Sequence, residues 1–109
     1  MALLAYQTYG SYTGVLPTHS AATTSDTVPW DEHGYLWYKS TQGTTEVITV
    51  VVPGSLFGIA ITDITVTIGA TTGEEVIGPL VQSLADPNTG LVTVTIADVT
   101  GITVAAVRA

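Results

Sequence analysis

The side chains best able to do chemistry in this chain are two histidines and nine acids, and their spacing forms no catalytic set. His19 precedes Ser20, but neighbouring residues of a strand point to opposite faces, so these two cannot act as base and nucleophile. Asp31, Glu32 and His33 are consecutive, and consecutive loop residues rarely converge on a metal ion. We therefore expect no catalytic, cofactor-binding or metal-binding residues, and no enzymatic activity.

Other polar residues lie in or beside expected turns, where their oxygens could hold calcium: Asp63, Asp86, Asn88 and Asp98. Their spacing matches no known calcium-binding loop, and turn chemistry explains them better. Glu74 and Glu75 are adjacent, whereas a glycosidase needs two carboxylates that face each other across a cleft. We interpret these acids as turn and surface residues.

The aromatic residues between 30 and 38 are the best candidates for binding a sugar, because flat rings pack well on apolar sugar faces. On an expected strand, however, Tyr35 and Trp37 share one face, and one face of that strand must belong to the core. An aromatic core or a subunit interface is therefore favoured, with Trp30, Trp37 and Tyr38 as candidate interface residues.

Three tyrosines recur at every third residue near the N-terminus, namely Tyr6, Tyr9 and Tyr12. In an extended segment this spacing presents the rings on one side, and rigid rings anchor well on a partner surface. We predict an extended N-terminal arm over residues 1–18 that docks on a partner through these tyrosines, followed by one β-domain over residues 19–109.

Composition excludes several classes of partner. The net charge is −7, with Lys39 and Arg108 as the two basic residues, so neither nucleic acid nor an anionic membrane is an expected ligand. The chain lacks cysteine, and its most apolar window is broken by proline and glycine, so we expect neither disulfides nor a spanning helix. The first residues have no basic region typical of a signal peptide, which favours cytoplasmic synthesis.

The remaining elements are short strands separated by turns that contain Gly, Pro, Asn or Asp. Residues 64–68 and 92–96 alternate aliphatic side chains with threonine, which predicts strands with one buried and one wet face. Residues 46–52 are almost continuously β-branched, which predicts burial on both faces or a place in the centre of a sheet. Further strands are expected at 35–39, 74–77 and 102–107, with a weaker candidate at 20–24. The pattern predicts an all-β sandwich or jelly roll of six to eight short strands.

Several segments, in this order, resemble small proteins encoded among the head genes of actinobacterial tailed phages. They are Thr13–Thr18, Ala21–Thr23, Ser25–Pro29, Val47–Gly54, Gly58–Asp63, Gly73–Leu80, Asp86–Pro87, Gly90–Val94 and Gly101–Arg108. The resemblance covers most of residues 13–109 and implies a capsid decoration or minor head protein, made in the bacterial host and located on the virion surface. It implies the major capsid protein as partner, and a symmetric oligomer suits that role, with a homotrimer as our expectation. The alternatives are a carbohydrate-binding or adhesion module of a phage fibre, or a tail component.

Overall fold

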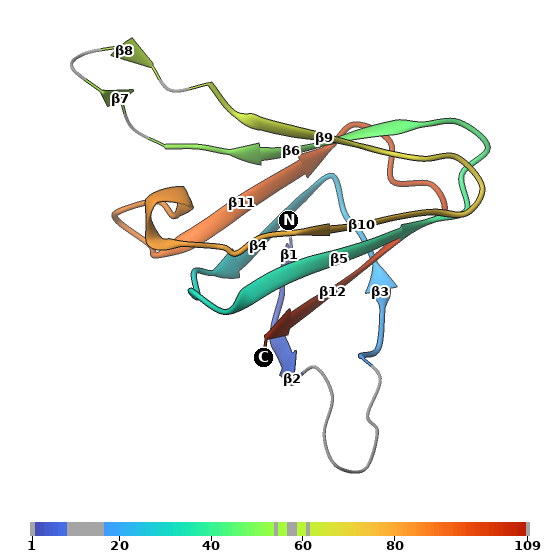
Figure 1. Cartoon of the computed structure of the whole chain (residues 1–109), viewed down its shortest axis with the longest axis horizontal. Coiled ribbons are helices and arrows are strands. Elements are labelled where there is room, and N and C mark those ends of the chain that lie inside the picture. The colour runs from blue at the N-terminus through green and yellow to red at the C-terminus, as the bar shows by residue number, and fades with distance from the viewer. Residues whose placement is uncertain (1, 9–16, 54, 57–58, 61, 109) are drawn as a thin grey trace.

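The computed structural model describes residues 2–8, 17–53, 55–56, 59–60 and 62–108, which form two β-sheets that share one core (Figure 1). Sheet A consists, in spatial order, of β1 (Ala2–Leu3), β4 (Ser25–Pro29), β11 (Leu91–Ile96), β6 (Glu46–Val51) and β9 (Ile64–Ile68). Sheet B consists of β10 (Gly73–Ile77), β5 (Gly34–Ser40), β12 (Ile102–Arg108) and β2 (Tyr6–Thr8), and β3 (Ser20–Ala21) also pairs with β12.

Two smaller elements lie outside these sheets. The strands β7 (Ser55–Leu56) and β8 (Ile59–Ala60) form a separate ribbon that continues the β6–β9 hairpin beyond the body of the sandwich (Figure 1). A single 3₁₀ turn, η1 (Gln82–Leu84), lies between β10 and β11. Within the described residues, the structure contains no helix with the length and apolar character needed to cross a membrane.

The predicted all-β sandwich is confirmed. Within the described residues, seven strands have five to seven residues, which agrees with the expected six to eight. The alternating segment 64–68 is β9, and the segments expected at 35–39, 46–52, 74–77, 92–96 and 102–107 each form a strand within one residue of those limits. The strand β6 is flanked by β11 and β9 and buries alternate residues only, so it lies inside a sheet but has one wet face.

The core follows from the period-two pattern, because each strand turns alternate aliphatic side chains toward the other sheet. In sheet A, β6 contributes Ile48 and Val50 and β11 contributes Val92, Val94 and Ile96, all of them 0–2% exposed. Sheet B contributes Leu36 and Tyr38 from β5 and Ile102 and Val104 from β12 to the same cluster. Burial of these side chains is the main stabilising term, at roughly 1.5–3 kcal/mol for each large aliphatic residue.

The strand β4 was not predicted, because its inward positions include an acid. Asp26 is 2% exposed and faces the core beside Val94 of β11. Its carboxylate accepts hydrogen bonds from the Thr23 amide at 3.1 Å and from the Thr23 hydroxyl at 2.5 Å. These bonds offset the cost of burying the polar group, so an acid is tolerated where the pattern calls for an aliphatic residue.

The turn before β11 shows how the polar turn residues act. The Asp86 side chain accepts a hydrogen bond from the Asn88 amide at 2.8 Å, and the Gly90 amide donates to the Asp86 carbonyl at 2.7 Å. Gly90 adopts a φ of 70°, a conformation that costs glycine little. The turn delivers the chain into β11 in register with β4, where Leu91 lies opposite Pro29.

Candidate functional site

The N-terminal segment belongs to the sandwich over residues 2–8. Here β1 pairs in parallel with β4, the Leu4 amide donates to the Thr27 carbonyl at 2.7 Å, and β2 pairs in parallel with β12. The chain therefore crosses from one edge of sheet A to one edge of sheet B. Tyr9 and Tyr12, two of the three predicted arm tyrosines, lie outside the described residues.

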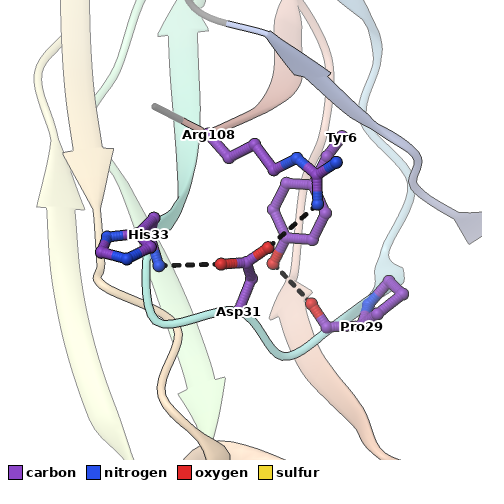
Figure 2. A network of polar contacts seen from close by, with 5 residues as sticks. All are labelled: Tyr6, Pro29, Asp31, His33 and Arg108. Carbon is purple, nitrogen blue, oxygen red and sulfur yellow. Dashed lines mark hydrogen bonds and ion pairs between the residues drawn. The ribbon is translucent and has the colours of Figure 1, made fainter.

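Tyr6 contacts the domain itself, as Figure 2 shows. Its hydroxyl donates to the Pro29 carbonyl at 2.5 Å, and its ring lies so close to Gly34 that a Cβ there would be 2.5 Å from the hydroxyl oxygen. Burial, and secondarily the charge of Asp31, raises the pKa of Tyr6 to about 12. Tyr6 thus fastens the N-terminal segment to the turn between β4 and β5.

The same turn holds the cluster Asp31-Glu32-His33. One carboxylate oxygen of Asp31 accepts from the His33 amide at 2.8 Å, and the other lies 3.2 Å from Nη1 of Arg108 (Figure 2). The hydrogen bond from the His33 amide lowers the pKa of Asp31, and Arg108 adds to this effect. Both oxygens are therefore engaged in holding the turn and the end of β12. Among the residues that the structure describes, no three His, Cys, Asp or Glu side chains are grouped closely enough to hold a metal ion.

The acids considered as calcium ligands accept hydrogen bonds from backbone amides. Asp63 accepts from the Val52 amide at 2.9 Å, and Asp98 accepts from the Thr100 amide at 3.0 Å and its hydroxyl at 2.8 Å. These hydrogen bonds lower the pKa of Asp98. Among the residues that the structure describes, Asp63, Asp86 and Asp98 are not grouped at one site.

The aromatic residues divide between core and surface. Tyr38 is 0% exposed, so it is a core residue and offers no surface for an interface. Trp37 lies on the outward face of β5, which the sequence had not distinguished from the core face, and its ring is surrounded by polar and charged side chains. Its indole N–H donates to Glu74 at 2.5 Å, the Lys39 ammonium lies 4.8 Å from the ring centroid, and the His19 ring packs edge-on at 4.8 Å. This arrangement does not favour a sugar platform at Trp37. Trp30 is 37% exposed.

Two hydrogen bonds join Gln7 and Thr18, which lie on either side of residues 9–16. The Gln7 side-chain amide donates to the Thr18 carbonyl at 2.7 Å, and its oxygen accepts from the Thr18 amide at 2.8 Å. Beyond Thr18, His19 packs on Trp37, and burial, with a smaller effect from Lys39, lowers the pKa of His19. His19 is therefore held against the outer side of sheet B, and the chain then enters β3, which pairs with β12.

A regular surface lies on the outer side of sheet A, and we call it the threonine face. Because Val92, Val94 and Ile96 of β11 point into the core, Thr93 and Thr95 point outward. A row of cross-strand neighbours crosses four strands from Ser25 through Thr95 and Thr49 to Thr65. The threonine face comprises Ser25, Val47, Thr49, Val51, Thr65, Thr67, Thr93 and Thr95, and none of these side chains carries a charge.

Sequence reasoning anticipated half of this face. The wet threonines of β9 and β11 were predicted, whereas β4 was missed and β6 was expected either to be buried on both faces or to lie in the centre of a sheet. The signal for β6 was Thr49, a hydroxyl residue at the outward position between Ile48 and Val50. Comparison with models of protein families, with curated proteins and with solved structures finds no match to this chain.

Proposed function

We propose that this protein is a bacteriophage capsid decoration protein that binds the outside of the capsid shell and stabilises it. Two features support the proposal: the resemblance of its segments to small head proteins of actinobacterial phages, and the kind of surface that the sandwich presents. The partner is the major capsid protein, and the protein acts by forming contacts, without chemistry of its own.

The threonine face is the observation that carries the proposal. It spans four hydrogen-bonded strands, so its side chains are held by a rigid backbone and lose little freedom on binding. Its residues are uncharged, and Val47 is 45% exposed. The buried centre of a protein interface is depleted of charged residues, so a surface of this type suits contact with another protein.

The distribution of charge fits the same role. Most of the nine acids lie in turns or on the edge strand β10, while the threonine face lacks charge. Both basic side chains are engaged within the chain, Arg108 with Asp31 and Lys39 with the Trp37 ring. The protein is therefore acidic overall but has one uncharged face, which disfavours binding to packaged DNA and suits an outer position on a shell.

A decoration protein gains stability on the shell by binding several subunits at once. A homotrimer at or near local threefold positions makes each contact with the shell three times, so its total affinity for the shell exceeds that of one copy. The expected result of light scattering, or of crosslinking on particles, is a species three times the mass of the 11.3 kDa chain. A monomer by both measurements contradicts the trimer.

A rebinding experiment tests the function itself. Purified phage capsids that lack this protein are incubated with the wild-type chain or with Thr49→Lys, and occupancy is measured after sedimentation. Thr49 is the centre of the threonine face, so a lysine there must lose its hydration when the face is covered, and occupancy falls at least about tenfold. The matched control is Thr72→Lys in the exposed turn between β9 and β10, which keeps wild-type occupancy.

Equal binding of both variants contradicts the assignment of this face. No binding of the wild-type chain contradicts the proposed function. The arm hypothesis is tested in the same assay with Tyr9→Ser and Tyr12→Ser together, for which reduced occupancy is expected. Tyr6 is left unchanged, because it fastens residues 2–8 to the domain.

A further inference from the structure

A groove runs along the side of the sandwich where the two sheets end. Strand β9 is an edge of sheet A and β10 is an edge of sheet B, and the chain passes directly from one to the other (Figure 1). Between them lies a groove of about 310 Å³, lined mainly by aliphatic side chains from both strands and by Leu84 of η1. Ile64 and Val76, at 44% and 58% exposure, are among its lining residues.

Both strands beside the groove have a free edge. Within the described residues, β9 pairs only with β6, and β10 pairs only with β5. A strand with one neighbour leaves backbone N–H and C=O groups along its other side available to an added strand. Aliphatic side chains between such edges favour an extended peptide as the ligand. Its backbone can form hydrogen bonds with the free edge while its side chains fill the apolar groove.

Among the described residues, one charged side chain lines the groove, and it indicates the chemistry of the occupant. Glu75 lies opposite Tyr38 in the register of β10 and β5, so it points to the inner side of the sheet, where the groove lies. The other lining residues are Gly78, Pro79 and aliphatic side chains such as Val66 and Ile77. A basic side chain on the incoming strand pairs with Glu75, while aliphatic neighbours on the same strand contact the remaining surface.

The same acid disfavours a second copy of this chain. Antiparallel pairing of two β10 edges brings the Glu74-Glu75 pairs of both copies together, and like charges on adjacent strands destabilise a sheet. An inward-pointing charge on an edge strand is a known barrier to self-association. Neither Lys39 nor Arg108 of a second copy offers a spare cation, since both are engaged within their own chain.

We propose that the groove between β9 and β10 binds an extended strand of the shell protein that carries one basic side chain between aliphatic ones. The identity of the partner rests on the proposed function, whereas the chemistry of the strand rests on the groove alone. Binding adds a strand to one edge and covers Ile64 and Val66, the aliphatic side chains of β9 that line the groove.

Two synthetic peptides of nine residues test the chemistry in solution. Both alternate valine and threonine, and they differ only at the central inward position, which is lysine in one and glutamate in the other. Binding to the whole protein is measured by fluorescence anisotropy, and the site is located by amide chemical-shift changes. The lysine peptide is expected to bind saturably, with shifts on β9 and β10, and about fivefold more tightly than the glutamate peptide.

Matched variants separate this site from the threonine face. Ile64→Lys places a charge in the groove and is expected to weaken binding of the lysine peptide at least about tenfold. Val47→Lys, at a position of nearly equal exposure (45% against 44%) on the threonine face, leaves peptide binding unchanged. Glu75→Gln abolishes the preference for lysine over glutamate.

The proposal is overturned if the lysine peptide shows no saturable binding, or if Ile64→Lys binds that peptide as tightly as the wild type does. It is also overturned if the chemical shifts of β9 and β10 change with protein concentration and not with peptide, because a second copy of this chain then occupies the groove. Peptide binding without capsid binding leaves the groove established and contradicts the proposed function. Capsid binding without peptide binding supports the proposed function and contradicts the assignment of the groove.

Discussion

Replacing Gly34 with alanine tests how residues 2–8 are held to the domain. The position has no unusual φ, so alanine is permitted by the backbone, but its Cβ would lie 2.5 Å from the Tyr6 hydroxyl and 2.7 Å from two ring carbons. These separations are well below van der Waals contact, so the Tyr6 ring must move. Its hydrogen bond to the Pro29 carbonyl and much of its packing are then lost.

The cost follows from those two contributions. The hydrogen bond contributes about 1 kcal/mol and the displaced part of the ring about another 1 kcal/mol, so Gly34→Ala lowers the free energy of unfolding by about 2 kcal/mol. Tyr6→Ala removes the whole side chain and costs about 3 kcal/mol, the lower end for an aromatic residue because Tyr6 is half-buried. With Tyr6 already removed, Gly34→Ala costs nothing and even gains about 0.5 kcal/mol by restricting the unfolded chain.

A double-mutant cycle measures this coupling. Urea unfolding of the wild type, both single variants and the double variant is followed by tryptophan fluorescence, and the free energies are compared. The expected coupling is about 2.5 kcal/mol, with the double variant no less stable than Tyr6→Ala. Additive costs would show that Tyr6 does not pack against Gly34, and the docking of β2 would have to be revised.

Three further predictions concern charge and pH. Burial, and then Lys39, lowers the pKa of His19 from 6.5, so the folded state resists protonation and the free energy of unfolding falls as the pH drops below 6.5. In urea unfolding, His19→Phe is expected to show a smaller fall than the wild type. The exposed control His33→Gln is expected to show the same fall as the wild type. The pKa of Tyr6 is raised from 10.0 to about 12, so the stability that the neutral Tyr6 hydroxyl contributes is intact below pH 10 and is lost between pH 10 and 12. Thermal melting of the wild type and of Tyr6→Phe over this range measures the loss. An equal loss of stability in both proteins contradicts the prediction. Arg108→Ala removes an ion pair whose arginine is 56% exposed, so it costs under about 1 kcal/mol in urea unfolding; a cost of 2 kcal/mol or more would be inconsistent with a surface pair.

Sequence periodicity predicted the long strands because one physical rule, alternate burial, governs each of them. It failed at β4, where Asp26 occupies a core position that only the bonds from Thr23 make tolerable. It also failed at β1 and β2, because strands of two and three residues carry no measurable period and depend on parallel pairing with β4 and β12. The strands β1, β2 and β4 were missed for the same reason: the residues that stabilise each of them lie outside its own segment of the sequence.

The candidate surfaces were predictable to different degrees. The wet threonines of β9 and β11 follow from alternation, but their assembly into one face requires the strand order, which the sequence does not contain. Tyr38 was considered for an interface because both faces of its strand carry aromatic rings, and the packing of Leu36 and Tyr38 against sheet A shows which face is buried. The groove arises where two sheet edges meet, so no single segment indicates it.

Immunogold labelling of intact phage particles that encode this chain tests the central claim most directly. Antibodies raised against the folded domain are expected to label the outer surface of the head, at a density that corresponds to many copies per particle. Label confined to the tail, or purified particles that contain none of the protein, would contradict the account.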